Sequence, residues 1–414
     1  MIEYFHPDPE ELQSLKAGPL SPHLDAFAVL LSRQRYCARN GWQKVQLVAD
    51  LSCWMARKRL QLQDLDEQRV ATFLETRWRK TPRQSGDKVT MTALLRQLRE
   101  ARAVPLPSAP MPSPVDLIQR DFGTFLLQER GLTQASVGQY LPVAGRFVHH
   151  RFPSGNIRLK KLCANDVTDF VLHDTSERGR RSAQLTTTVL RSFLNFLFRD
   201  GRIAVKLAAA VPTVAGWRLS ELPRFLEAAE VEKVLRSCDR RRKTGKRDYA
   251  ILLLLARLGL RAGEAARLSL DDINWDAGEL CVHGKGARVD RLPLLSDVGQ
   301  AVADYLHKGR PACVSRQIFI QSKAPYEGIA GPSSIDGIVR RALSRARLHP
   351  RHQGAHLLRH SLATRMLGSG ASLAQVGQVL RHQQAQTTEI YAKVHVTALR
   401  ALAQPWPGGV RCAR

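Results

Sequence analysis

The stretch YAILLLLARLGLRAGEAARL, residues 249–268, joins the longest apolar run of the chain to a segment of small and charged residues. The apolar run has no polar face, which predicts a helix over about residues 249–258 that is buried on all sides. It is far shorter than the roughly 20 residues of a membrane span, so it predicts the core of a folded domain. Arg261 lies just after this run. Because a buried guanidinium without a partner is costly, we expect Arg261 either to pair with Glu264 or Asp271 or to bind an anion.

The composition predicts folded domains and an anionic partner. Hydrophobic residues make up 44% of the 414 residues and charged residues 24%, which argues against a disordered or fibrous chain. The 63 Lys and Arg exceed the 37 Asp and Glu by a formal charge of +26, more than solubility requires. Nucleic acid is the simplest partner for this charge. The N-terminus lacks the basic and apolar regions of a secretory signal, so we expect a cytoplasmic, nucleoid-associated protein with no membrane partner.

The cysteines predict neither a disulfide framework nor a zinc site. Their number is odd, they are scattered, and no C-x-x-C pair occurs. We expect reduced packing residues at Cys37, Cys53, Cys163, Cys238, Cys281, Cys313 and Cys412.

Proline spacing predicts the main boundary of the chain. Over residues 104–114 a proline occurs at nearly every second position, which forbids a helix and favours an extended spacer. A second break over residues 206–223 contains small residues and two prolines. These breaks predict an additional helical N-terminal domain, a helical DNA-binding domain, a mixed α and β domain, and a C-terminal tail, which are residues 1–103, 115–205, 224–394 and 395–414.

The two helical domains share a sequence pattern. Residues 62–74 and 159–171 match in their apolar positions, and both predict an extended lead-in, a capping residue and a helix. A duplicated module would produce this match, but so would two unrelated helical bundles, and the sequence leaves both open. Each domain predicts four or five amphipathic helices with basic polar faces, which suit a DNA duplex.

From about residue 227 the pattern changes to helices with a small sheet. Residues 279–283 and 289–294 predict two strands, and the tight turn at residues 284–287 predicts a β-hairpin. The fold class predicted for the whole chain is mainly α, with an α+β domain that carries a small antiparallel sheet. The helices predicted in that domain besides the buried one cover residues 230–237, 334–347, 356–367 and 373–380.

Lys285 lies between two glycines at the tip of the predicted hairpin. A flexible ammonium there can reach into a cleft, and the glycines allow a ligand to approach the backbone closely. A solvent-exposed turn lysine has the same pattern, and the complete phosphate-binding loop GxxxxGK[ST] is absent. The pattern therefore indicates that Lys285 either contacts DNA or has no function.

The segment HLLR places His356 and Arg359 on one face of a helix that we expect to begin at Gly354. In this arrangement both side chains can grip one phosphate. His352, His356 and His360 also have the spacing of zinc ligands on a helix. No glutamate follows His356, however, and His352 falls across the expected helix start, so we predict no metal here.

Tyr391 completes a set of groups suited to phosphoryl transfer. Alone, this tyrosine is typical of an ordinary core or surface aromatic. In a chain that holds DNA it accompanies two arginines, a lysine and two histidines, of which His382 lies nine residues before it. Phosphoryl transfer without a metal needs cations for the non-bridging oxygens, an acid for the leaving oxygen and a positioned nucleophile. The set supplies each of these.

From residue 116 to 395 the sequence resembles the tyrosine recombinases, the phage-type integrases. The segments that carry the resemblance occur in the family's order and spacing, and they are GLR at 259–261 with Glu264, GKG at 284–286 with Arg291 and Pro293, HLLR at 356–359, and LRH at 380–382 with Tyr391. The resemblance implies an enzyme that cuts and rejoins DNA through a 3′-phosphotyrosyl bond. Because the ester stores the energy of the broken bond, neither a nucleotide nor a metal cofactor is implied.

The resemblance also implies a role for each residue of the set. Two arginines would clamp the scissile phosphate, a lysine would protonate the departing 5′ oxygen, and a histidine would act as general base or phosphate ligand. A second histidine would hydrogen-bond a phosphate oxygen, a tyrosine would attack, and a glutamate would orient the cluster. In this order the residues are Arg261 and Arg359, Lys285, His356, His382, Tyr391 and Glu264.

The family further implies double-stranded DNA as partner and a homo-oligomer on it, expected as a synaptic tetramer, with companion recombinases left open. The tail 395–414 would dock on a neighbouring protomer or on its own chain. Basic stretches predict added contacts to DNA phosphates, although such runs are also common on solvated faces. These residues are Arg178, Arg180, Arg181, Arg240, Arg241, Arg242, Lys243, Lys246, Arg247 and Arg288.

Residues 1–103 form an additional block that the simplest family members lack. Such an extension is typical of integrases or transposases of mobile elements. They could bind DNA arm sites, clamp DNA or bind a protein, and the sequence does not choose. Two other functions remain open for the chain as a whole. One is a type IB topoisomerase, which relaxes DNA without exchanging partners, and the other is a DNA-binding regulator that does not cut.

Overall fold

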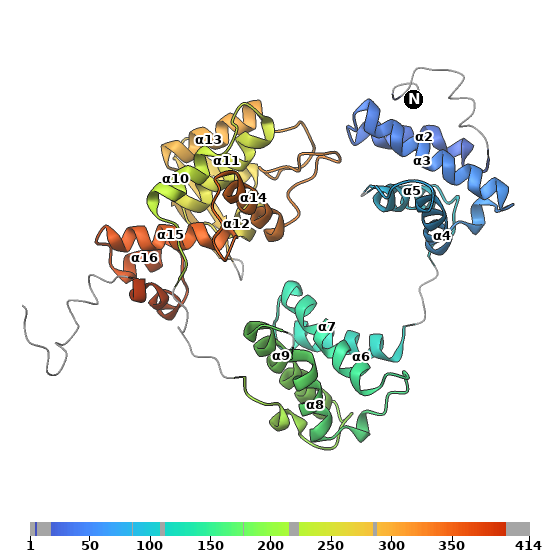
Figure 1. The fold of residues 1–414 in the computed structure, drawn as a ribbon, viewed down its shortest axis with the longest axis horizontal. Helices are drawn as coiled ribbons and strands as arrows, with labels where there is room; N and C mark the ends of the chain where they lie inside the picture. The colour runs from blue at the N-terminus through green and yellow to red at the C-terminus, as the bar shows by residue number, and fades with distance from the viewer. Residues whose placement is uncertain are drawn as a thin grey trace, which may run out of the picture. The chain divides into compact units, whose positions relative to one another are not determined.

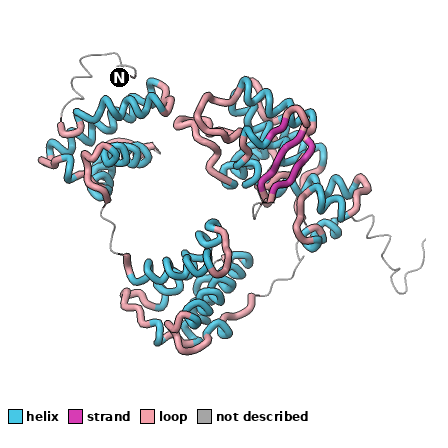
Figure 2. The backbone as a smooth tube through the Cα atoms, turned by 180° about the vertical axis from the view of Figure 1, so that it is seen from behind, coloured by secondary structure: helices cyan, strands magenta, loops and turns pink. Residues whose placement is uncertain are grey.

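The computed structural model describes Phe5 and residues 18–84, 86–107, 112–176, 178–214, 223–284 and 288–394. These residues form mainly helices, together with a three-stranded antiparallel sheet in the order β1-β2-β3 (Figure 2). The chain divides into two compact units, one of residues 107–220 and one that combines residues 1–106 with 221–414. The predicted fold class is confirmed, and the finer domain division stays a prediction.

The N-terminal part is a helical bundle of α2 (Ser21–Arg33), α3 (Ala38–Arg57), α4 (Glu67–Trp78) and α5 (Asp87–Glu100) (Figure 1). Each helix turns its apolar face inward, because its apolar residues recur at helical spacing. The core these faces share includes Phe27, Leu51, Trp54, Met55, Phe73 and Leu94.

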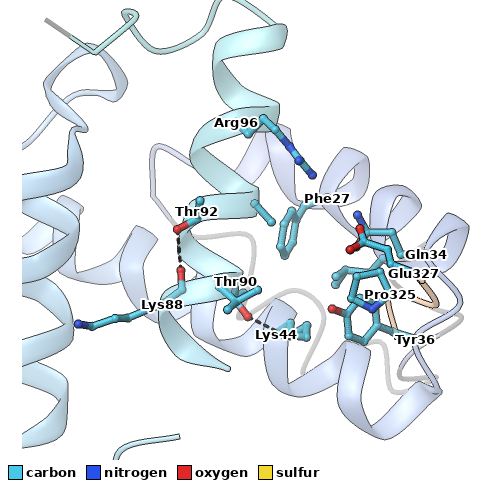
Figure 3. A pocket seen from close by; sticks show the side chains of 13 residues that line it. Phe27, Gln34, Tyr36, Lys44, Lys88, Thr90, Thr92, Arg96, Pro325 and Glu327 are labelled. Atoms are coloured by element: carbon cyan, nitrogen blue, oxygen red, sulfur yellow. Dashed lines mark hydrogen bonds between the residues drawn. The ribbon is translucent and has the colours of Figure 1, made fainter. Parts of the chain in front are cut away.

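A pocket opens on these N-terminal helices, and Figure 3 shows Phe27, Tyr36 and Lys44 among its lining. The Lys44 ammonium donates a hydrogen bond to Thr90 Oγ1 at 2.7 Å and lies 4.9 Å from the centre of the Tyr36 ring. Burial lowers the pKa of Lys44 despite the nearby carboxylate of Asp87. The lining residues are distinct from the predicted catalytic set.

The second unit is a bundle of α6 (Pro114–Gln128), α7 (Gln134–Arg151), α8 (Ala164–Thr175) and α9 (Arg180–Arg199) around a core rich in phenylalanine. The predicted spacer therefore ends one residue earlier than expected, because Pro114 is the first residue of α6. Proline suits that position, where its missing N–H would have no partner within the helix. Residues 108–111 of the spacer lie outside the described residues.

The matching segments of the two bundles also match in structure. A single 3₁₀ turn, η2 (Leu62–Asp64), precedes α4, and another, η3 (Leu159–Lys161), precedes α8. The prediction of an extended lead-in was wrong, because backbone hydrogen bonds from residue i+3 to residue i close these turns, such as Leu162 N to Leu159 O at 3.0 Å. Whether the modules are duplicated stays open.

The third part surrounds the buried helix α11 (Lys243–Arg257), of which every residue from 250 to 256 is buried. Helices α13 (Ser296–Lys308) and α15 (Ala355–Gly368) pack against it. The predicted hairpin is confirmed, with β2 (Glu279–His283) paired to β3 (Val289–Pro293). The other elements are α10 (Ala228–Arg236), α12 (Ala262–Arg267), β1 (Ile273–Asn274), α14 (Pro332–Arg345), α16 (Leu373–Val379), and the 3₁₀ helices η4 (Leu207–Ala210), η5 (Leu270–Asp272), η6 (Ala385–Thr387) and η7 (Glu389–Val394).

Within the described ranges, no helix is both long and apolar enough to span a membrane. The six cysteines in these ranges are free. Cys412 and the tail 395–414 lie outside the described residues.

Candidate active site

Gly259 turns the chain between α11 and α12, and this turn is the base of the site. Its φ is +60°, in the left-handed region that favours glycine. A Cβ atom there would lie 2.7 Å from Leu380 Cδ2 and 3.0 Å from Leu362 Cδ2. The glycine therefore allows the turn to contact both α15 and the end of α16.

Arg359 is buried on α15 and reaches across this turn. Only 4% of the residue is exposed, and its guanidinium donates hydrogen bonds to the carbonyls of Gly259 and Leu380. Burial, with the charges of Arg261 and Arg381, lowers the pKa of Arg359 to about 10, so it is still a cation at neutral pH. Because these partners are neutral carbonyls, the charge remains available to an anion.

Arg261 caps the short helix α12, and its partner is Glu264. The Glu264 carboxylate accepts 2.7 Å from Arg261 Nη1 and 2.8 Å from the Arg261 backbone N–H. Burial alone would raise the pKa of Glu264, but these hydrogen bonds and the charge of Arg381 hold it below its ordinary value. Of the two pairing partners considered, Asp271 instead binds Arg316.

The two arginines converge on consecutive backbone carbonyls. Arg359 donates to the carbonyl of Leu380, and Arg261 Nη2 lies 3.5 Å from the carbonyl of Arg381. These carbonyls end α16 and lead directly into His382. Residues more than 100 positions apart in the sequence are thereby brought to one place.

Tyr391 is 1% exposed, and its hydroxyl is 2.8 Å from His360 Nδ1. Burial raises the pKa of Tyr391 to about 12, although Arg359 and Arg261 act in the opposite direction. Burial, then the charges of His356 and Arg359, lowers the pKa of His360 to about 4. At neutral pH both groups are therefore uncharged, and the phenol keeps its proton.

His360 was missed as a site residue by the sequence analysis. Its position next to Arg359, four residues after His356, was weighed only as part of a zinc set. Within the described ranges, no cluster of three or more His, Cys, Asp or Glu residues is suited to a metal. The signal that could have found His360 is its helical spacing from the rest of HLLR, which places it one turn after His356.

Of the other predicted histidines, His382 lies beside Tyr391 and His356 lies beside His360. His382 Nδ1 is 2.8 Å from Thr388 Oγ1, and the His382 ring is parallel to the Tyr391 ring, with centres 6.4 Å apart. Burial, with Arg359 and Arg261 next, lowers the pKa of His382 to about 4. His356 is exposed, and its ring meets His360 edge-on at 5.9 Å between centres.

Lys285 lies outside the described residues, so its predicted place at the site is not settled. The hairpin on which it lies is closed by a backbone hydrogen bond from Gly284 N to Arg288 O at 2.7 Å. The hairpin is linked to Arg381 through Asp290 on β3, whose carboxylate lies 3.9 Å from Arg381 Nε.

The residues predicted to contact DNA differ in exposure. Lys246 and Arg247 are occupied within the fold, since Lys246 pairs with Asp304 and the buried Arg247 pairs with Asp248. Arg288 is exposed and pairs with Asp290 at 2.7 Å. The exposed members of the set are Arg178, Arg180, Arg181, Arg240, Arg241, Arg242, Lys243 and Arg288.

Several known proteins are similar to this chain. Residues 224–397 match the phage integrase family. A Sinorhizobium fredii protein named as an integrase/recombinase, y4rA, is 42% identical over 393 residues, which cover 94% of this chain and 95% of that protein. The chain belongs to the tyrosine recombinase family. It is thus a site-specific recombinase by family, as the resemblance implied.

Other relatives of this recombinase agree. The tyrosine recombinase XerD of Listeria innocua is 31% identical over 293 residues, 69% of this chain and 95% of that protein. Among solved structures, XerH bound to palindromic difH substrate has a TM-score of 0.57 at 19% identity, over 82% of this chain and 95% of that one. A lambda integrase dimer bound to a core site has a TM-score of 0.51 at 17% identity, over 66% and 94%. At these identities the two structures show that the recombinase shares the fold.

Proposed function

We propose that this recombinase cuts and rejoins double-stranded DNA with Tyr391 as nucleophile and with Arg261 and Arg359 as the clamp for the scissile phosphate. The observation that carries the proposal is the convergence of both guanidinium groups on the carbonyls of Leu380 and Arg381, beside His382. Two cations held this way, with little freedom to relax, are preorganised for the charge of a phosphoryl transition state.

The proposed reaction is a transesterification. The phenolic oxygen of Tyr391 forms a bond to phosphorus while the bond from phosphorus to the 5′ oxygen breaks. The phenol loses its proton, and the departing 5′ oxygen gains one from Lys285, the role implied by the family. His382 donates a hydrogen bond to a non-bridging oxygen. The reverse attack by a 5′ hydroxyl rejoins DNA, so the two steps need no external energy.

We infer that Tyr391 is inactive until DNA binds. Its hydroxyl is buried and bound to His360, and its pKa of about 12 keeps it protonated. We propose that phosphate binding by the arginines accompanies release of the phenol from His360. Once released, the nucleophile can approach the phosphate, and its proton passes to His356, the residue to which the family assigns the role of general base.

The partners of the recombinase belong to the same proposal. The related XerH and lambda integrase structures are named as complexes with DNA sites, which supports DNA as the substrate here. A related Tn1549 transposon integrase structure of the same fold is named as a complex with circular intermediate DNA. We propose a mobile-element recombinase that acts as a tetramer on nucleoid DNA in the cytoplasm.

A nicked suicide substrate tests the function. DNA that flanks the encoding gene is cut into duplexes, each nicked near a candidate crossover, and incubated with the full chain. We expect a protein–DNA adduct at a 3′ phosphate, absent from Tyr391→Phe. Tyr305→Phe is the matched control, because Tyr305 is equally buried and its hydroxyl also has a partner, the Ile320 N–H.

Three outcomes would contradict the proposal. An adduct that persists in Tyr391→Phe would exclude this nucleophile. Relaxation of supercoiled DNA without recombinant products would identify a type IB topoisomerase. DNA binding with no adduct on any duplex would identify a regulator that does not cut.

A further inference from the structure

Arg381 is a buried arginine in a backbone position that glycine usually occupies. It lies two residues after Val379, the last residue of α16, and here His382 N donates to Gly377 O at 2.9 Å and Arg381 N donates to Gln378 O at 3.0 Å. This double hydrogen bond is the Schellman motif, whose central residue adopts a left-handed conformation. Arg381 has a φ of +56° and is only 6% exposed. Both the left-handed backbone and the buried charge cost free energy, so the surroundings must hold this residue in place.

The guanidinium of Arg381 shares a carboxylate with a proposed catalytic arginine. Arg381 Nη2 donates to Glu264 Oε2 at 2.7 Å, while Glu264 Oε1 accepts from Arg261 Nη1 at the same distance. Glu264 is therefore fixed from both sides, and its orientation sets that of Arg261. Arg381 Nη1 is also 3.5 Å from the carbonyl of Leu258, at the start of the loop that leads to Arg261.

The third nitrogen of the guanidinium is directed at the hairpin. Among the described residues, Arg381 Nε has no hydrogen-bond partner and is buried. The carboxylate of Asp290 on β3 lies 3.9 Å from this nitrogen. Arg381 therefore stands between α12, the end of α16 and the hairpin.

We propose that Arg381 is a positioning residue for the recombination reaction, which acts through Glu264 to hold Arg261 and, by the turn it occupies, His382 in one fixed geometry. The proposal rests on the catalytic roles proposed above for Arg261 and His382. Arg381 itself does not bind the phosphate, because its Nη2 is engaged by Glu264. Its removal should slow DNA cleavage while DNA binding remains.

The test is Arg381→Gly, because glycine fits a φ of +56° without strain and only the guanidinium is lost. Adduct formation on the nicked substrate should slow by roughly tenfold to a hundredfold, since a catalytic group is loosened rather than removed. DNA affinity should change by less than about twofold, because arginine contacts to DNA elsewhere supply most of the binding. Arg381→Lys should recover part of the rate, since an ammonium can still bind Glu264.

Two controls separate positioning from a general loss of structure. Arg347→Gly changes an exposed arginine with nearly the same φ, +55°, and should leave the cleavage rate unchanged. Combining Arg381→Gly with Glu264→Gln should be no slower than Glu264→Gln alone, because both changes break the same chain of contacts.

Several results would overturn the inference. These are an unchanged cleavage rate in Arg381→Gly, effects of Arg381→Gly and Glu264→Gln that multiply, or a rate loss matched by an equal loss of DNA affinity. In each case the wild-type chain still forms an adduct that Tyr391→Phe lacks, so the proposed function stands. If the wild-type chain forms no adduct at all, the proposed function fails and the role of Arg381 fails with it.

Discussion

The hydrogen bond between Tyr391 and His360 joins two uncharged buried groups, and its energy can be measured. In His360→Phe the phenol hydroxyl would remain buried without a partner, at a cost of about 1–3 kcal/mol in the free energy of unfolding. Urea unfolding of the purified protein measures this cost. Adding Tyr391→Phe should recover most of it, because both partners are then apolar. A double variant less stable than His360→Phe would contradict this account.

The depressed pKa values of His360 and His382, about 4 each, predict a pH dependence of stability. Unfolding releases these rings to an ordinary pKa near 6.5, so between pH 6.5 and 4 the unfolded chain binds more protons than the folded one. Stability should therefore be complete above about pH 6.5 and decline as the pH falls toward 4. Thermal unfolding across this range should show the decline, and His360→Asn should make it shallower. An equal slope in the variant would exclude His360 as a cause.

At the residue scale, the sequence predicts best those side chains whose chemistry is marked by local spacing. His356 and Arg359 lie three positions apart on one helix. Arg261 was identified as a candidate because it follows a long apolar run. His360 and Arg381 could not be identified in this way. Their partners, Tyr391 and Glu264, are 31 and 117 positions away, and only the fold brings them together.

At the scale of elements, the turn between α11 and α12 requires glycine at position 259 for two reasons, its left-handed backbone and its close contact with Leu380. Two glycine-to-alanine variants separate these reasons. Gly259→Ala imposes both a left-handed alanine and a contact with Leu380, whereas Gly278→Ala, at φ +62° with open space around it, imposes only the first. We expect Gly278→Ala to cost about 1 kcal/mol and Gly259→Ala distinctly more. Urea unfolding measures both, and equal costs would show that space at Gly259 is not limiting.

The bounds of helices and strands with a clear hydrophobic period were predicted to within a few residues. Elements without such a period were not predicted. The hairpin and the helices α10, α14, α15 and α16 follow from apolar spacing and caps. The six-residue α12 is too short to show a hydrophobic period, so the sequence analysis predicted no helix there and placed Arg261 after a helix over about residues 249–258. In the structure α11 ends at Arg257, and Arg261 is the N-cap of α12.

For the whole molecule, the charge of +26 predicts binding to DNA that weakens steeply with salt. The structure distinguishes basic residues that are exposed from those that are paired within the fold. Replacing the exposed Arg180 and Arg181 by glutamine should reduce the slope of log affinity against log salt by about one unit for each lost phosphate contact. Lys246→Gln should leave the slope unchanged, because Lys246 is paired with Asp304. Fluorescence anisotropy over a salt series measures the slopes, and equal slopes for both variants would contradict this distinction.

Tyr391 belongs to a small apolar cluster with Leu362, Leu367, Val376 and Leu380, separate from the main core around α11. A small cluster buries little surface, so it can open by itself at a lower free energy than global unfolding requires. Amide protons of α16 and η7 should therefore exchange with solvent sooner than those of α11. Tyr391, the proposed nucleophile, would then be exposed by a brief local opening of α16 and η7, while the core around α11 stays intact.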